Sequence, residues 1–339
     1  MSDPATAVHP PSPPPAVVWT TRKALLGVVL ALPAAVVCVG DPSKGAALAV
    51  GVLAAAVTGL ADTRRARVRN LGLDLTVGVA LFVGAVLAAF PVAAVVVLFA
   101  VAVGASLVVA RSPAGNVLLG LVVPVLAIGL SYEDLGDAAS FAVLIGVGSV
   151  YAFVISLLWP VPAAAGAAPV APPPRPSRAM MLDYGVRLGL AVGIAATIGF
   201  ALDLEHVGWA AGACALVMRP NPTMLRMRGV DRVVSVTLGA VVACFLVLAG
   251  APGWVIGLVV LVDLAASAGT NGSRWYLAGG FNTLLVFLML LVGDPQDASH
   301  RFWERVGETV LGVALAFVFG LLVPAARARR RAAAAEAAP

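Results

Sequence analysis

The chain has 339 residues, of which 61% are hydrophobic and 12% are charged, and its formal net charge is +5. Soluble domains carry about 25% charged residues, so this chain has too few polar side chains to cover a surface in water. Composition excludes a soluble globular protein and points to lipid as the solvent.

Apolar runs between charges and turn residues predict twelve membrane-spanning helices. A Pro-rich segment, 1–22, precedes them and is expected to be a disordered tail, and a basic tail over 325–339 follows them. The first six-helix unit, 23–160, is predicted to have helices at 24–40, 45–61, 71–89, 91–110, 114–131 and 138–160. After a Pro/Ala-rich linker, 161–180, the second unit, 181–324, is predicted to have helices at 184–202, 206–218, 230–249, 252–270, 275–293 and 302–324.

The basic residues predict the orientation of these helices. With twelve spans and a cytoplasmic amino terminus, 19 of the 22 basic residues fall on the cytoplasmic side, and only Lys44, Arg301 and Arg305 fall outside. This distribution obeys the positive-inside rule and predicts a multi-pass protein of a bacterial inner membrane with both termini cytoplasmic. Nucleic acid is not an expected partner, because the basic residues are spread over seven segments.

The two predicted units align at an offset of 163 residues. The aligned arginines are Arg65 with Arg228, Arg69 with Arg232, and Arg111 with Arg274. Because each unit has six spans, both have the same orientation, which predicts two parallel six-helix repeats. The fold class is therefore an all-α polytopic membrane protein.

Motifs for enzymatic chemistry are missing from the sequence. No phosphate-binding loop of the GxxxxGK[ST] type is present, and the three histidines and three cysteines are scattered along the chain. We therefore expect no enzyme, no cofactor and no metal site. An enzyme acting on lipid-linked substrates would require clustered His, Asp and Glu, which the sequence does not show.

Charged groups inside the predicted spans are candidates for function because they are costly in hydrocarbon. Asp263 lies deep in its predicted helix, and it is either an ion-pair partner for Arg232 or Arg274, or a coupling or gating carboxylate. Glu308 is a second candidate for coupling, about one and a half turns below the outer surface.

The short apolar segment after His206 is a further candidate, because Pro220 and Pro222 interrupt its continuation. Short, proline-interrupted spans point to binding regions in transporters, and guanidinium groups suit carboxylates. The candidate substrate-binding residues are Trp209, Arg219, Asn221, Thr223, Arg226, Arg228, Arg232 and Arg274. The competing interpretation is an interfacial tryptophan followed by topology-setting arginines.

These residues carry a resemblance to a known family. Trp209, Arg219-Pro220, Thr223, Arg226, Arg228, Arg232 and Gly239-Ala240 resemble the signature stretch of the FUSC (fusaric acid resistance) or aromatic acid exporter family. Ser235-Val236 departs from the common Gly-Thr of that stretch, and only a linker stands where many members have a large cytoplasmic domain. The resemblance implies membrane export, with aromatic carboxylates as the best-known type of substrate.

Two hypotheses for function follow. The first is a transporter that exports small organic anions, with aromatic carboxylates as candidates, driven by the membrane potential or a proton gradient. In it, the arginines orient the carboxylate and Trp209 contacts the ring. The second is a non-transporting membrane scaffold or envelope-assembly subunit. The expected partners are the organic anion and the lipid bilayer, and the sequence leaves a homo-oligomer open.

Overall fold

The structure is a computed structural model that describes residues 17–58, 60–61, 63–112, 114–160, 175–270, 281, 283–286, 288 and 298–336. These residues form helices joined by short turns, and no strand occurs among them. The helices of the first half are α1 (Thr21–Gly40), α2 (Pro42–Thr58), α3 (Arg64–Ala88), α4 (Pro91–Val109), α5 (Ala114–Val117), the π-helical turn η1 (Leu118–Val122), α6 (Val123–Gly129) and α7 (Leu135–Leu158). Those of the second half are α8 (Arg178–Ala201), α9 (Trp209–Val217), α10 (Pro222–Leu248), α11 (Gly253–Gly269), α13 (Ala298–Phe317), the π-helical turn η3 (Val318–Leu322) and α14 (Val323–Glu336).

The described helices confirm the class of an all-α membrane protein. Seven of them are long and apolar enough to cross a membrane. Each predicted range that is described contains a helix, although several boundaries differ: α2 ends at Thr58 and α9 begins only at Trp209. The predicted helix 275–293 lies largely outside the described residues. The count of twelve spans therefore remains a prediction.

Two long helix pairs make the most extensive contacts between the halves of the chain. The first helix, α1, packs along α11, and α8 packs along α4. Small residues make both approaches close: a methyl group on Gly27 would overlap the backbone of α11, and one on Gly189 would overlap Phe99 of α4. Close packing through small residues is the usual way for helices to associate in lipid. In α8, Gly185, Gly189 and Gly193 stand four residues apart and so share the face that approaches α4.

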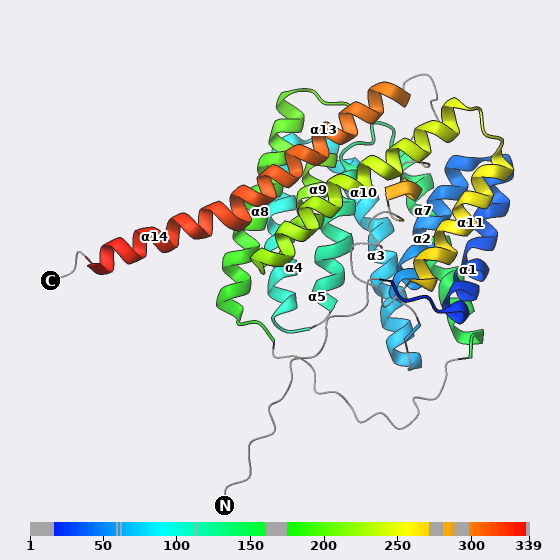
Figure 1. Cartoon of the computed structure of the whole chain (residues 1–339), viewed down its shortest axis with the longest axis horizontal. Helices are drawn as coiled ribbons and strands as arrows, with labels where there is room; N and C mark the ends of the chain where they lie inside the picture. The colour runs from blue at the N-terminus through cyan, green and yellow to red at the C-terminus, as the bar shows by residue number, and fades with distance from the viewer. Residues whose placement is uncertain are drawn as a thin grey trace, which may run out of the picture.

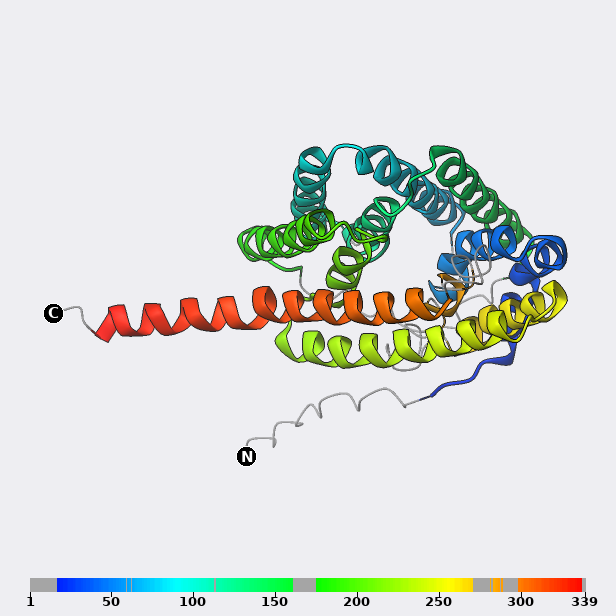
Figure 2. The ribbon, with the colours of Figure 1, turned by 90° about the horizontal axis from the view of Figure 1, so that it is seen from above.

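The helices α10 and α13 run side by side along one face of the bundle (Figures 1 and 2). Most of the other helices lie on one side of this pair when the molecule is seen from above (Figure 2). Beyond η3, α14 continues α13 and extends away from the bundle (Figure 1). Part of the predicted basic tail, up to Glu336, is therefore helical.

Both π-helical turns precede a proline. Pro124 follows η1 and Pro324 follows η3, and a glycine, Gly120 or Gly320, stands four positions earlier. A proline has no N–H to donate and its ring crowds the preceding turn, and a π turn is one way in which a helix accommodates such a disruption. The sequence analysis did not foresee these turns.

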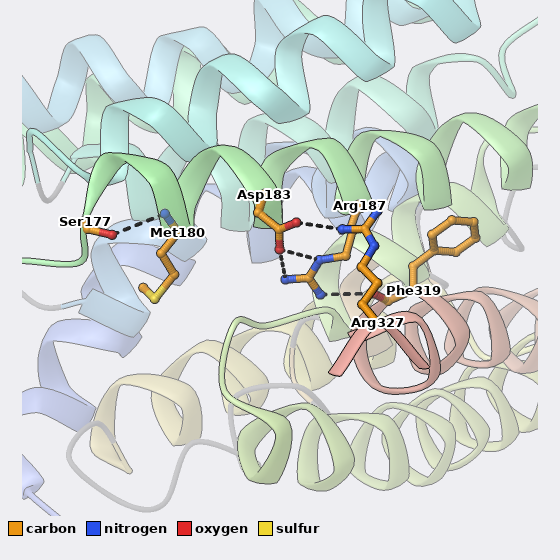
Figure 3. Close-up of polar contacts among 6 residues, drawn as sticks. All are labelled: Ser177, Met180, Asp183, Arg187, Phe319 and Arg327. Atoms are coloured by element: carbon orange, nitrogen blue, oxygen red, sulfur yellow. Dashed lines mark hydrogen bonds and ion pairs between the residues drawn. The ribbon is translucent and has the colours of Figure 1, made fainter. Parts of the chain in front are cut away.

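The second π turn is joined to α8 by a polar network (Figure 3). Pro324 cannot donate to the carbonyl group of Phe319, five residues before it, and Arg187 Nη1 donates to that oxygen instead at 3.0 Å. The carboxylate of Asp183 accepts from Arg187 Nε at 2.9 Å and from Arg327 Nη1 at 2.8 Å. The network fixes the start of α14 against α8.

Candidate functional site

The first half of α13 carries polar side chains into the packed interior. Glu304, Arg305, Glu308 and Thr309 lie at positions i, i+1, i+4 and i+5, so they share one face of the helix. Arg305 is 2% exposed and Glu308 is 4% exposed. Since α13 packs against α9 and α10, these charges lie between helices.

The start of α9 brings His206 and Trp209 to this face. The chain turns between α8 and α9 through Asp203, whose φ of 50° is in the left-handed region, and α9 then begins at Trp209. Gly208 makes this start feasible, because a methyl group there would overlap the carbonyl group of Ala127 in α6. The glycine lets α9 begin in direct contact with the first half of the chain.

His206, Trp209 and the start of α13 form a continuous set of contacts. The two rings of His206 and Trp209 stack with centroids 3.7 Å apart, and the guanidinium carbon of Arg305 lies 4.2 Å from the centroid of Trp209. His206 is also held by Glu304, whose carboxylate oxygens lie 2.9 Å from Nδ1 and 3.2 Å from the backbone nitrogen. A cation over an indole face is attracted by its quadrupole, so Trp209 positions Arg305.

Arg232 of α10 supplies a second buried guanidinium group. Its Nη1 donates to Thr283 Oγ1 at 3.2 Å, and its charge acts on Arg305. Arg305 in turn interacts electrostatically with Glu308, three residues further along α13. We refer to the group His206, Trp209, Arg232, Glu304, Arg305 and Glu308 as the buried polar cluster.

The hydrogen bonding of this cluster is incomplete within the described part of the chain. Neither carboxylate oxygen of Glu308 has a hydrogen-bond partner among the described residues, and the same holds for Nε of Arg232. Removing an ion from water costs several kcal/mol unless partners compensate. If Glu308 gives way, Arg305 can accept another anion, and the guanidinium group of Arg232, which acts on Arg305, adds a second positive charge.

Three of the predicted site residues, Trp209, Arg232 and Glu308, belong to the buried polar cluster. The role expected for Trp209 needs revision. Its indole contacts His206 and Arg305, whereas the sequence analysis predicted a contact with the aromatic ring of the substrate.

Arg219 has a different environment. Its Nη1 donates to the carbonyl oxygens of Ala215 at 3.1 Å and Met218 at 2.6 Å, and the hydroxyl of Tyr184 donates to that same Met218 oxygen at 2.9 Å. Burial lowers the pKa of Arg219 from its usual value, and the contact with Tyr184 opposes this shift. A basic side chain on the last carbonyl groups of a helix stabilises its end, so Arg219 caps α9.

The predicted start of the next helix, at residue 230, is wrong, because α10 begins at Pro222. Asn221 caps it: Oδ1 accepts from the backbone nitrogens of Thr223 at 2.9 Å and Met224 at 3.1 Å. Pro222 therefore starts a helix, since its missing N–H is not needed in the first turn.

The early start of α10 distributes the predicted arginines around a helix. Thr223 and Arg226 are exposed, Arg228 is half-buried, and Arg232, one turn further on, is buried. Residues two apart in a helix face different directions, so this segment is not one arginine-rich loop. Arg274 lies outside the described residues.

Asp263 lies in α11, a helix that contributes no residue to the buried polar cluster. It is 4% exposed, and α11 packs against α1 and α2. The expected ion pair with Arg232 is not formed; the carboxylate that acts on Arg232 is that of Asp231. The Oδ2 atom of Asp263 has no hydrogen-bond partner among the described residues.

Sequence reasoning missed three members of the cluster: His206, Glu304 and Arg305. Arg305 was counted among the basic residues on the outer side, although the packing of α13 (Ala298–Phe317) buries it. The available signal was the spacing of Glu304, Arg305 and Glu308, which places their charges on one face at the start of an apolar run.

A cavity of about 240 Å³ lies in the first half of the chain. It is lined by α2, α3, α7 and η1, and its polar groups include Arg67, Asn70 and Asp74. The side chain of Arg67 is committed to the carbonyl groups of Ala61 and Ser156. None of the residues of the buried polar cluster lines this cavity.

The apolar helices and the buried charges define a multi-pass α-helical membrane protein. Residues 194–319 match the family described as fusaric acid resistance protein-like. This match confirms the resemblance seen in the sequence, and the matched region includes the buried polar cluster.

Two curated proteins are similar to part of the chain. Both are named p-hydroxybenzoic acid efflux pump subunit AaeB. The protein of Edwardsiella tarda is 26% identical over 171 residues, covering 43% of this chain and 25% of its own length. The protein of Enterobacter cloacae is 26% identical over 166 residues, covering 42% of this chain and 24% of its own length. The chain thus matches about a quarter of the length of these relatives. No solved structure matches the chain.

Proposed function

We propose that this protein exports small organic anions, with aromatic carboxylates as the candidate substrates. The observation that carries the proposal is the buried polar cluster, where Arg305 interacts with Glu308 and with the second buried arginine, Arg232, in the region that matches the family. Two relatives named as efflux pump subunits for p-hydroxybenzoic acid support the same class of substrate.

Binding of the anion follows from the charges of the cluster. The substrate carboxylate replaces Glu308 as the counter-charge of Arg305, and Arg232 provides the second guanidinium group. Charge-assisted hydrogen bonds of this type are about twice as strong as neutral ones. The stack of His206, Trp209 and Arg305 supports this role, because it holds the guanidinium group of Arg305 in place before the anion arrives.

The membrane potential suffices to drive such export. Moving one negative charge outward across 100 mV, inside negative, releases about 2.3 kcal/mol, which corresponds to roughly a fifty-fold gradient. A proton gradient is the alternative driving force. In that case Glu308 is the better candidate for the coupling group, because Asp263 lies apart from both buried arginines.

The proposal includes twelve spans in two parallel repeats, in a bacterial inner membrane, with both termini cytoplasmic. The recurrence of helix pairs in the two halves supports the repeat. The first helix of each half packs on the fourth helix of the other half, as α1 on α11 and α8 on α4. Within each half, the second helix packs on the last one, as α2 on α7 and α9 on α13.

The test is export from proteoliposomes that contain the purified chain and p-hydroxybenzoate, with a potassium diffusion potential, inside negative. We expect export by the wild type and its loss in Arg305→Gln, whereas Arg226→Gln, which removes an exposed arginine, retains it. Collapsing the pH gradient while the potential is kept separates the two driving forces. Export that is absent from the wild type for a panel of aromatic and aliphatic carboxylates contradicts the proposal.

The second candidate is a non-transporting subunit of an envelope assembly. The word subunit in the names of both relatives favours a partner chain. This candidate predicts that the reconstituted chain carries no flux and that its stability in cells depends on the partner. The export assay above therefore distinguishes the two candidates directly.

A further inference from the structure

A group of possible metal ligands lies at one end of the buried polar cluster. One ligand atom each from Glu205, His206 and Glu304 lies within 4.8 Å of the others. Nδ1 of His206 and Oε2 of Glu304 are 2.9 Å apart. Ligand atoms at about 2.0–2.2 Å from a tetrahedral metal ion lie about 3.5 Å from one another, so this group needs only small side-chain movements to enclose an ion.

The charges around this group point independently to a cation. The carboxylate of Glu308 interacts electrostatically with those of Glu304 and Glu205, and its oxygens have no hydrogen-bond partner among the described residues. The three carboxylates of Glu205, Glu304 and Glu308 and the two arginines of the cluster sum to a formal charge of −1, and of these five residues only Glu205 is exposed. A divalent ion would compensate this excess of negative charge.

We propose that Glu205, His206 and Glu304 bind one divalent transition-metal ion of the Zn²⁺ type. One imidazole and two carboxylates are ligands of intermediate hardness, which suit Zn²⁺ and neighbouring first-row ions better than Mg²⁺ or Ca²⁺. Glu205 is exposed while His206 and Glu304 are largely buried. The ion would therefore enter from the solvent side, and water would complete its coordination.

The ion would join the turn between α8 and α9 to α13, since Glu205 and His206 belong to the turn and Glu304 to the helix. It would also draw the charge of Glu304 away from Arg305, on which Glu304 acts. Metal binding does not require that the chain transport anything.

The test is a calorimetric titration of the full chain with Zn²⁺ in detergent, without a histidine tag, since a tag binds the same ions. We expect one ion per chain, and binding about tenfold weaker or more in Glu304→Gln and in His206→Ala. Glu304→Gln should remain folded, because its amide group can replace both contacts with His206. The matched control is Asp203→Asn, which removes a carboxylate from the same turn but not from the ligand group, and it should bind like the wild type.

Co²⁺ provides a second measurement, because its visible absorption reports nitrogen and oxygen ligands directly. We expect a Co²⁺ spectrum in the wild type that disappears in His206→Ala and persists in Asp203→Asn. The proposal is overturned if the wild type shows no saturable binding, or if Glu304→Gln and His206→Ala bind Zn²⁺ as tightly as the wild type. Neither outcome affects the export assay, so the two proposals fail separately.

Discussion

Replacing Arg305 with glutamine should affect both stability and export, for separable reasons. Arg305 and Glu308 are 2% and 4% exposed and interact across one turn of α13. Removing one member of a buried ion pair costs about 3–5 kcal/mol, because the remaining charge loses its partner. We expect Arg305→Gln to destabilise the chain by a loss of this order, measured by reversible unfolding in mixed detergent micelles.

The double variant Arg305→Gln/Glu308→Gln separates the two effects. Replacing both charges with neutral groups of similar shape removes the uncompensated carboxylate, so most of the lost stability should return. Export should not return, because the guanidinium group that binds the substrate is still missing. A double-mutant cycle in stability should therefore show a coupling of about 0.5–3 kcal/mol between the two sites, while the export rates of the single and double variants stay equally low.

Two results would refute this reasoning. If Arg305→Gln unfolds like the wild type, the two charges do not compensate each other in the folded chain. If the double variant exports p-hydroxybenzoate at the wild-type rate, Arg305 serves only to neutralise Glu308 and does not bind the anion. Arg226→Gln is the control for the loss of one positive charge, since Arg226 is exposed on α10.

Three further predictions concern other positions. Gly208→Ala should lower the melting temperature, because the added methyl group overlaps the Ala127 carbonyl group and overpacking costs about 1–3 kcal/mol. The control is Gly104→Ala, whose added carbon has no atom within 4 Å. This variant should leave the melting temperature unchanged or raise it. Asn221→Ala should lower the free energy of unfolding by about 1 kcal/mol, because the cap of α10 is lost, and should leave the KM for the substrate unchanged. A raised KM would show that Asn221 contributes to substrate binding. Asp263→Asn should retain export driven by the potential alone, and its loss in that assay would show that Asp263 acts in transport.

The positions of the helices could be read from the sequence because lipid imposes a simple requirement. A spanning helix needs an apolar run of fixed length, and the runs are interrupted by charges or turns, such as Phe90-Pro91 before α4. The beginning of α10 was missed for a physical reason: Pro222 was treated as a helix breaker, whereas Asn221-Pro222 is a capping residue followed by a proline in the first turn.

The candidate site could be predicted only in part. A sequence indicates where along a membrane helix a residue lies better than it indicates which neighbour its side chain faces. Arg305 and Arg232 both stand near helix ends in the sequence, where arginines usually face water, but the packing of α13 against α9 and α10 encloses them. Arg219 was predicted to bind the substrate, and yet its guanidinium group donates to carbonyl groups at the end of α9. The distinction depends on which face each helix presents to its neighbours, and one sequence without packing information does not contain it.

The pairing of α1 with α11 also sets the order in which the chain can be assembled. The last residue of α1 and the first of α11, Gly40 and Gly253, are 213 positions apart. During synthesis, α1 is therefore in the membrane before its main partner, α11, has been made. The pair of α4 and α8 closes earlier, since only 69 positions separate Val109 from Arg178. A truncated chain that ends before α11 would leave the small-residue face of α1 open to other membrane helices.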